Sequence, residues 1–304
     1  MASLHLHVVN QVCRFIVRPH LARTPTPEKA KADLDLTAKL TFPRPAGLTI
    51  RDEGELSWIS AGPCADGQVI LYLHGGGYIA GSPKTHAPML GRLSSLSGVM
   101  VAAPDYPLAP GHAAPAQFDH AVAAHARLTA MGYAPDQIVV GGDSAGGGLA
   151  LALVAHLCQT DQRPAGVFAF SPWTDLTLSG ASIEANAARD RLFDVSRIRE
   201  IVGYVAPSLA TDDPRVSPLF ADFPNPPPAL IRASETEILF DDGRRIAEKL
   251  QAAGGEVSFK TLPDAPHVWP IFDGWMSEAR ETLREAAVFC RDVLSSRVRS
   301  TNES

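Results

Sequence analysis

The feature that most constrains the fold is an alternation of short apolar runs with longer segments of helical character, which begins near residue 69. Each run is short and continuous, as is typical of a strand buried on both faces of a sheet. The apolar runs are Val69–Leu73, Val99–Ala103, Ile138–Val140, Val167–Phe170, Ala229–Ala233 and Val257–Leu262. The helical segments include Ala114–Ala130, Ala145–Cys158, Asp241–Ala253 and Ser277–Ser295. This order predicts βαβ units and a mostly parallel sheet with helices on both faces.

Two regions interrupt the alternation, residues 1–45 and residues 178–223, and together they could form a cap. The first region opens with apolar residues at helical spacing, which predict an amphipathic helix with one apolar stripe. The stripe consists of Leu4, Val8, Val12, Phe15 and Ile16. It has two interpretations: the stripe packs on the core of the protein, or the helix forms a lid over a binding site.

Composition narrows the class of protein. The chain has 304 residues with 45% hydrophobic residues, enough to bury a large core, and a net charge of -6 argues against a nucleic-acid partner. The four cysteines are scattered and show no metal-binding spacing, so they are expected to be reduced thiols. No apolar run is long enough for a membrane span, and the N-terminus lacks the pattern of a secretory signal. A cytoplasmic location is the expectation.

The segment Gly142-Asp-Ser-Ala-Gly146 lies between a predicted strand and a predicted helix. This is the G-x-S-x-G pattern of a nucleophile elbow, in which a strained turn presents the serine at the tip of a sheet. The turn requires small residues two positions before and after the serine, and Gly142 and Gly146 satisfy that requirement. The N-terminus of the following helix directs free N–H groups to the same place. Ser144 is therefore the candidate nucleophile.

A run of glycines, His74-Gly-Gly-Gly77, follows the strand Val69–Leu73. An oxyanion hole needs backbone N–H groups that converge on one position, and consecutive glycines allow the backbone to adopt that shape. The N–H of Ala145, which follows the candidate nucleophile, supplies a further donor. His74 is interpreted as an anchor of this loop rather than as a catalytic base.

The chain order of this kind of site is serine, then an acid, then histidine. Only two histidines follow Ser144, and His156 falls within a predicted helix, whereas His267 lies on a loop after the last predicted strand. His267 is therefore the candidate base. The acid should follow the strand Ala229–Ala233, where four carboxylates compete and the sequence pattern ranks them poorly. They are Glu235, Glu237, Asp241 and Asp242.

Competing chemistries lack their usual motifs. There is no H-E-x-x-H and no close cluster of histidine and aspartate, so no metal is expected. There is also no phosphate-binding loop and no dinucleotide-binding fingerprint, so no cofactor is expected.

Taken together, five motifs resemble those of the bacterial hormone-sensitive lipase family of carboxylesterases, over some two-thirds of the chain from about Val69 to about Phe272. They are His74-Gly-Gly-Gly77, Asp105-Tyr-Pro-Leu-Ala-Pro110, Gly142-Asp-Ser-Ala-Gly-Gly147, Ser171-Pro-Trp-Thr-Asp175 and Pro266-His267. The sequence departs from the usual D-Y-R-L-A-P-E at Pro107 and Gly111. Those two positions are interpreted as loop stabilisers that leave the chemistry unchanged.

The resemblance implies an α/β-hydrolase fold with a mostly parallel eight-stranded sheet and a helical cap. The cap would comprise residues 1–45 and an insertion at 178–223, and the catalytic domain residues 46–177 and 224–304. The site would be Ser144, His267 and an acid, with Gly76, Gly77 and Ala145 as oxyanion donors. The family acid is usually an aspartate at the position of Glu237, so Glu237 is the first choice and Asp241 the second.

The expected function is hydrolysis of short- to medium-chain acyl esters through an acyl-serine intermediate, with a small-molecule ester as substrate. Two alternatives stay open: an inactive small-molecule-binding protein of the same fold, and an amidase or deacetylase. The family resemblance also allows a homodimer, although no segment of the sequence identifies an interface.

Overall fold

The computed structural model describes residues 3–301, with side chains described as far as residue 295. Within these residues the chain forms one eight-stranded sheet with the strand order β1-β2-β4-β3-β5-β6-β7-β8. The strands are β1 (Leu48–Glu53), β2 (Leu56–Ala61), β3 (Val69–Leu73), β4 (Met100–Pro104), β5 (Ile138–Asp143), β6 (Gly166–Phe170), β7 (Ala229–Ser234) and β8 (Val257–Leu262). Every predicted apolar run is a strand, and the predicted fold is confirmed.

The sheet is mostly parallel. Strands β3 to β8 pair in parallel, whereas β1 pairs with β2 and β2 pairs with β4 in the antiparallel sense. The β1–β2 hairpin was not among the predicted runs. Its first strand has no buried residue, and its second strand, although buried, contains Ser57 and Ser60, so neither shows a continuous apolar run. In a parallel sheet the carboxyl ends of the strands share one edge, where ligands bind.

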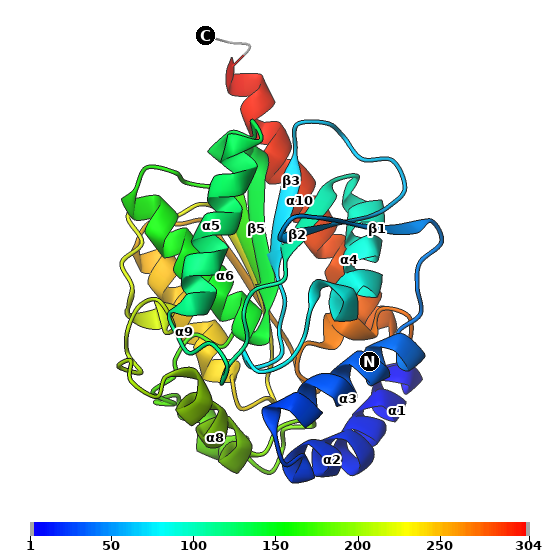
Figure 1. Ribbon diagram of the computed structural model, residues 1–304. Coiled ribbons are helices and arrows are strands. Elements are labelled where there is room, and N and C mark those ends of the chain that lie inside the picture. The colour runs from blue at the N-terminus through cyan, green and yellow to red at the C-terminus, as the bar shows by residue number, and fades with distance from the viewer. Residues whose placement is uncertain (1–2, 302–304) are drawn as a thin grey trace.

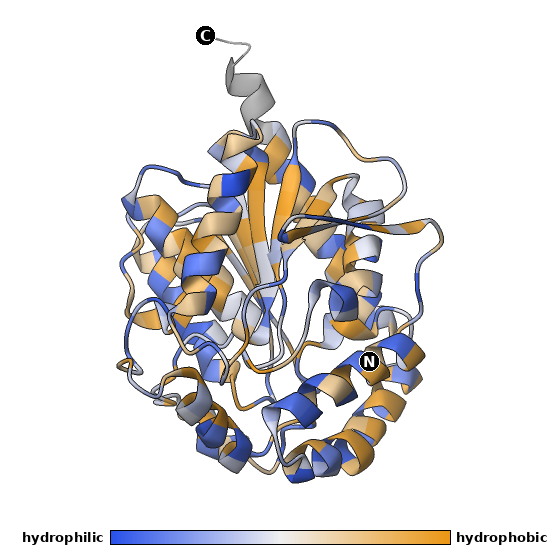
Figure 2. Cartoon of the chain, in the orientation of Figure 1, coloured by the Kyte–Doolittle hydropathy of each residue, from blue (hydrophilic) through white to orange (hydrophobic). Residues whose placement is uncertain are grey.

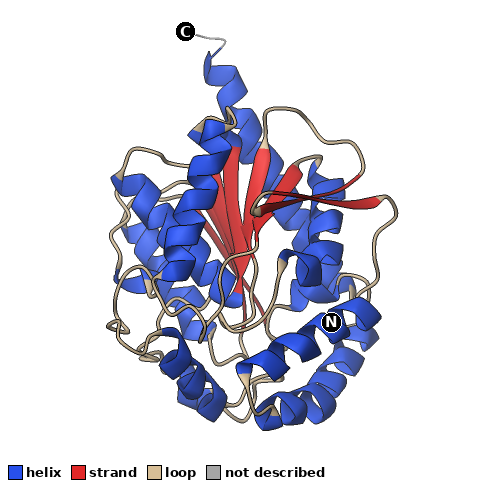
Figure 3. Cartoon of the chain, in the orientation of Figure 1, coloured by secondary structure: helices blue, strands red, loops and turns tan. Residues whose placement is uncertain are grey.

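Helices cover both faces of the sheet (Figure 3). They are α4 (Pro83–Ser97), α5 (Ala116–Ala130), α6 (Ser144–Gln159), α9 (Phe240–Ala252) and α10 (Ser277–Thr301), with short 3-10 turns η2 (Pro135–Gln137), η3 (Pro218–Phe220) and η4 (Trp269–Phe272). Figure 1 shows α5, α6 and α9 on one side of the sheet and α4 and α10 on the other.

The two layers follow from the alternation of side chains along each strand. In β3, Val69, Leu71 and Leu73 join a core cluster with α5, α6 and α9. Ile70 and Tyr72 point the opposite way and join a second cluster with α4 and α10. Both faces of the strand are therefore buried, which is why its sequence shows a continuous apolar run.

The remaining helices come from the two regions that interrupt the alternation. They are α1 (Leu4–Val12), the π-helical turn η1 (Cys13–Val17), α2 (Arg18–Arg23), α3 (Pro27–Thr41), α7 (Ser182–Ala185) and α8 (Val195–Val205). Figure 1 shows α1, α2, α3 and α8 at the lower end of the view, beyond the ends of the strands.

One interpretation of the first helix is wrong. The apolar stripe of residues 4–16 does not pack on the core of the protein, because all five of its side chains are exposed. The face that packs on the protein instead carries Leu6, Asn10 and Cys13. Figure 2 shows the hydrophobic colour on these N-terminal helices at the surface.

Candidate active site

Ser144 lies at the junction of β5 and α6. Its φ is 52°, a value that residues other than glycine rarely adopt. The sharp turn brings backbone segments together on both sides. A Cβ atom at Gly142 would lie 2.3 Å from the carbonyl oxygen of Gly146, and one at Gly146 would lie 2.2 Å from that of His74. Only glycine fits at either position. The strain is thus stored at the residue that the turn presents at the edge of the sheet.

His267 contacts Ser144 directly. Its Nε2 lies 2.8 Å from Ser144 Oγ, although the two residues are far apart in the sequence. The loop that carries His267 is fixed just beyond it, where Val268 adopts a φ of 52° and its N–H donates to Ser171 Oγ. A positive φ at a β-branched residue is a genuine outlier, so this backbone is held by its surroundings.

Glu237 completes a chain of hydrogen bonds. Its Oε2 lies 2.6 Å from His267 Nδ1, and its Oε1 accepts a hydrogen bond of 2.8 Å from the N–H of Ser234 at the end of β7. All three side chains of the Ser144–His267–Glu237 chain are buried. In this arrangement a carboxylate holds one imidazole nitrogen while the other faces the hydroxyl.

The other carboxylates near β7 have different partners. Glu235 accepts a hydrogen bond from Thr261, and Asp241 accepts one from the N–H of Ser182 and pairs with Arg244. Asp242 accepts hydrogen bonds from the N–H groups of Thr174 and Asp175. Glu237 is the one of the four candidates that contacts His267.

The glycine loop presents two backbone N–H groups, those of Gly76 and Gly77, as possible hydrogen-bond donors. The N–H of Gly75 donates to Asp143 Oδ1 at 3.0 Å, which turns that donor away from the site. Gly76 follows with a φ of 120°, and a Cβ atom there would lie 2.3 Å from the carbonyl oxygen of Ala80. Within the described part of the chain, the N–H groups of Gly76 and Gly77 are hydrogen-bonded to no other group. They are free to bind an oxygen atom.

A buried polar network lies behind this loop. Besides the Gly75 N–H, Asp143 Oδ1 accepts a hydrogen bond of 2.8 Å from Tyr72 Oη and lies 3.4 Å from His86 Nε2. Burial alone would raise the pKa of Asp143, but the attraction of His86 and the hydrogen bonds hold it below its usual value. Burial would likewise lower the pKa of His86, yet the charge of Asp143 raises it above its usual value. Each of the two groups therefore stabilises the charged form of the other.

His74 does not act as a positively charged partner of Asp143. Its ring stacks on Tyr106 with the centroids 4.1 Å apart, and its Nδ1 lies 2.9 Å from the carbonyl oxygen of Gly75. Burial, followed by repulsion from His86, lowers the pKa of His74 to about 3. Tyr106 in turn donates to the carbonyl oxygen of His74 at 2.5 Å. A neutral, stacked imidazole is an anchor of the loop and not a base.

The acid side of the site is held by residues that the sequence patterns did not single out. Asn186 Nδ2 donates to the carbonyl oxygen of Glu237 at 2.9 Å, and the N–H of Ile238 donates to Asp190 Oδ2 at 2.8 Å. The ring of Phe193 meets the His267 ring edge to face, with the centroids 4.8 Å apart. Asn186, Asp190 and Phe193 lie in the 178–223 insertion, where no motif or periodicity marks them.

The described residues also bear on metal binding and on membrane insertion. No group of three or more histidine, cysteine, aspartate or glutamate residues has a metal-binding arrangement there. Among the same residues, no helix is both long and apolar enough to cross a bilayer.

Comparison with known proteins identifies the family. A family described by its alpha/beta hydrolase fold matches residues 70–271. An esterase of Acinetobacter venetianus is 36% identical over 224 residues, which cover 73% of this chain and 74% of the relative. An acetyl-hydrolase of Streptomyces hygroscopicus is 36% identical over 230 residues, covering 74% of this chain and 76% of the relative.

Solved structures agree. The crystal structure of an esterase from the bacterial hormone-sensitive lipase family superposes with a TM-score of 0.90 at 32% identity, covering 97% of this chain and 100% of that one. The chain belongs to the α/β hydrolases, in the bacterial hormone-sensitive lipase family. The predicted family, fold and carboxylesterase class are confirmed.

Proposed function

We propose that this protein is a serine carboxylesterase that hydrolyses short- to medium-chain acyl esters through an acyl-serine intermediate. The observation that carries the proposal is the hydrogen-bonded chain from Ser144 through His267 to Glu237, placed beside a glycine loop with free N–H groups. Names of relatives such as esterase and acetyl-hydrolase support the same reaction class.

The geometry supports the following first half of the reaction. His267 Nε2 takes the proton of Ser144 Oγ as that oxygen forms a bond to the ester carbonyl carbon. The carbonyl oxygen becomes an oxyanion, held by the N–H groups of Gly76, Gly77 and Ala145. The intermediate then collapses, the bond to the alcohol oxygen breaks, and His267 returns its proton to the departing alcohol.

The second half repeats these steps with water. His267 takes a proton from water as the water oxygen bonds to the acyl carbon, and the bond to Ser144 Oγ breaks with return of the proton to the serine. Glu237 orients the imidazole and stabilises its charged form. No step in this scheme requires a metal or a cofactor.

The preference for shorter acyl chains is proposed to come from the cap. Phe193 packs against His267, so an apolar side chain of the inserted segment already lies at the reacting groups. A long acyl chain would have to displace such packing, whereas a short one would not. The acetyl-hydrolase relative supports this size preference.

A cytoplasmic location and assembly as a homodimer belong to the same proposal. The four cysteines are all free thiols, which fits a reducing compartment. Dimerisation is carried over from the family resemblance, and light scattering of the purified protein tests it.

The test of the function is hydrolysis of p-nitrophenyl esters over a series of acyl lengths, with matched amides alongside. The wild type should turn over short esters fastest and the amides far more slowly, and Ser144→Ala should abolish the ester activity while keeping the same melting temperature. A folded wild type that hydrolyses no ester would contradict the proposal, and faster cleavage of the amides would change the reaction class to an amidase.

A further inference from the structure

The exposed apolar stripe of the N-terminal helices needs an explanation. Leu4 is 75% exposed, Phe15 66% and Ile16 65%, and Val8 and Val12 are also exposed. We call these five residues the apolar face. Single exposed apolar residues are ordinary, but a continuous row along one helix marks an interaction surface.

The orientation of the apolar face is fixed by polar contacts on the opposite side of the helix. Asn10 Nδ2 donates to the carbonyl oxygen of Asp264 at 2.9 Å, and Ser3 Oγ donates to Glu278 at 2.8 Å. Arg18 donates to the carbonyl oxygens of Ala187 and Asp190. The helix therefore cannot simply roll over to bury its apolar residues without breaking these contacts.

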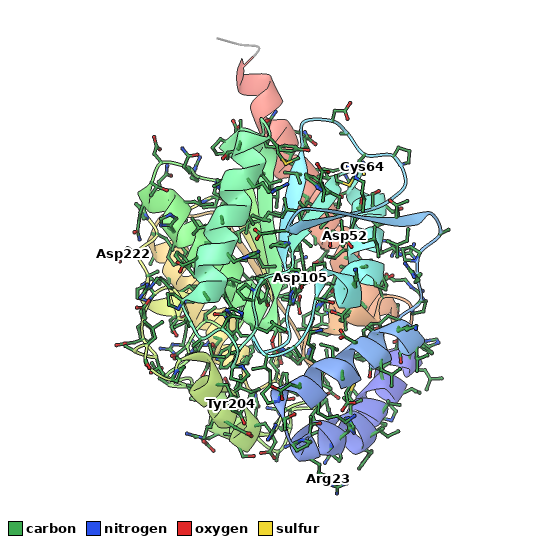
Figure 4. All side chains as sticks on the ribbon, in the orientation of Figure 1. Arg23, Asp52, Cys64, Asp105, Tyr204 and Asp222 are labelled. Carbon is green, nitrogen blue, oxygen red and sulfur yellow. The ribbon has the colours of Figure 1, made fainter. Side chains whose placement is uncertain are left out.

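The segment that carries the apolar face is basic. Residues 1–27 contain three arginines and no aspartate or glutamate, in a chain whose net charge is -6. Arg14 is exposed next to Phe15, and Figure 4 shows Arg23 at the outer tip of α2, directed away from the protein. The local charge is thus opposite in sign to that of the whole molecule.

A cleft with arginines lies beside η1. Its volume is about 420 Å³, and it is lined by Arg14, Ala188, Arg189, Arg191, Thr236, Pro263 and Asp264. Arg191 pairs with Asp264 at 2.8 Å. Among the described residues, Arg14 and Arg189 form no ion pair, which leaves two guanidinium groups available for an anion. We call this the arginine cleft.

We propose that the apolar face and the arginine cleft together dock the protein on the surface of an anionic lipid layer. Apolar side chains would enter the boundary of the acyl chains, and the guanidinium groups would bind headgroup phosphates. An amphipathic helix with apolar residues on one side and basic residues beside them binds lipid in this way, lying in the plane of the surface. The proposal is independent of the esterase reaction.

A second copy of the chain fits the surface less well. A symmetric dimer through this face would bring each copy's patch against the same patch of its partner. The unpaired arginines of the two copies would then approach each other, which is unfavourable because no carboxylate of the patch remains to pair with them. An anionic lipid surface satisfies both the apolar and the basic residues.

The experiment is co-sedimentation with vesicles of phosphatidylcholine, with and without phosphatidylglycerol. The wild type should bind the vesicles that contain phosphatidylglycerol, and added salt should weaken the binding. Phe15→Ser with Ile16→Ser, and separately Arg14→Gln with Arg189→Gln, should each weaken it by about tenfold or more, since each buried apolar side chain and each charge contact adds to the binding.

Matched controls carry the same substitutions elsewhere. Met131→Ser removes an apolar side chain that is 46% exposed, and Arg51→Gln removes an exposed arginine on β1. Both control variants should bind the vesicles like the wild type. The Phe15 and Ile16 variant and both controls should keep the melting temperature and the turnover of a soluble ester, and the arginine variant should keep the melting temperature. The proposal is overturned if the wild type does not bind the anionic vesicles. It is equally overturned if both docking variants bind normally, or if light scattering shows a dimer that the Phe15 and Ile16 changes dissociate.

Discussion

The two sides of the candidate site are supported by different parts of the molecule. On the oxyanion side, the glycine loop rests on Asp143, Tyr72 and His86, which belong to the central strands and to α4. On the acid side, the loop of Glu237 is bound by Asn186 and Asp190, which belong to the segment inserted between β6 and β7.

The reaction thus has its oxyanion donors and its acid supported by separate parts of the protein. Oxyanion donors stabilise the transition state most when they are held rigidly in place, and a buried network anchored in the sheet supplies that rigidity. The acid is instead held by the segment that also places Phe193 against His267. We therefore expect changes in the inserted segment to reach the chemistry through Glu237, while leaving the oxyanion side intact.

The largest expected effect tests the acid itself. Glu237→Gln should lower kcat about 10⁴-fold, because the neutral amide neither fixes the imidazole tautomer nor stabilises the imidazolium. Asp241→Asn is the matched control, since Asp241 pairs with Arg244 and not with His267. Steady-state kinetics on a short p-nitrophenyl ester measure both. If Asp241→Asn abolished turnover and Glu237→Gln did not, the acid would be Asp241.

The next effect tests the oxyanion side. Gly76→Ala should lower kcat by about 10²–10³, the cost of losing one oxyanion donor, because its Cβ would meet the carbonyl oxygen of Ala80 and displace the loop. The value of KM should change much less, since the donor acts mainly in the transition state. Circular dichroism and thermal unfolding establish that the variant is folded. A normal kcat in a folded Gly76→Ala protein would show that this loop does not stabilise the oxyanion.

A smaller effect is expected from the inserted segment. Asp190 accepts hydrogen bonds from the N–H groups of Leu192, Phe193 and Ile238, and Asp190→Asn would turn an amide N–H₂ group toward at least one of them. We expect kcat to fall about tenfold through a misplaced Glu237, in line with the cost of one disturbed buried hydrogen bond. Asp194→Asn, on the same segment but at an exposed helix start, serves as the control. Equal kinetics of the two variants would show that the insertion does not position the acid.

The smallest effect concerns stability and pH. Because folding raises the pKa of His86 above 6.5, its contribution to the free energy of unfolding is complete below 6.5 and is lost as the pH rises through the folded pKa. The lowered pKa of Asp143 gives a contribution that is present above 3.8 and lost as the pH falls through its folded value. His74 faces the pair but stays neutral in this range.

Denaturant unfolding measured from pH 6 upward tests this assignment, since ionisable pairs give such pH-dependent stability. The free energy of unfolding of the wild type should fall as the pH rises through the pKa of His86. In His86→Gln this decrease should be smaller, because glutamine does not titrate. The comparison between the two proteins cancels the contributions of other groups. Identical slopes would mean that His86 is not charged in the folded protein.

Sequence patterns predicted the parts of the fold that carry strong local signals. The six apolar runs became strands because burial on both faces requires continuous apolar residues. The ends of three of the four predicted helices lie within two residues of those observed, whereas the last helix extends beyond its predicted end, to Thr301. The β1–β2 hairpin lacked that signal, since no residue of its outer strand is buried. The apolar stripe of residues 4–16 allowed two interpretations, of which packing on the core is wrong, because periodicity shows that a helix has two faces but not which one meets the protein.

The candidate site divides in the same way. Ser144 and the glycine loop stand in local motifs whose geometry follows from neighbouring residues, so their sequence reveals them. The choice of Glu237 among four carboxylates depended on family resemblance, because the contact with His267 forms only when two distant loops meet. Asn186 and Asp190 act through contacts to backbone groups of another loop, and no sequence pattern encodes such contacts.

The role of Ser144 as the nucleophile is best tested by mass spectrometry of the protein quenched during turnover of p-nitrophenyl butyrate. We expect a butyryl group on the peptide that contains Ser144. It should form together with a burst of p-nitrophenol before steady state and be absent from Ser144→Ala. A butyryl group on a different residue, or full turnover by Ser144→Ala, would contradict the assignment of Ser144 as the nucleophile.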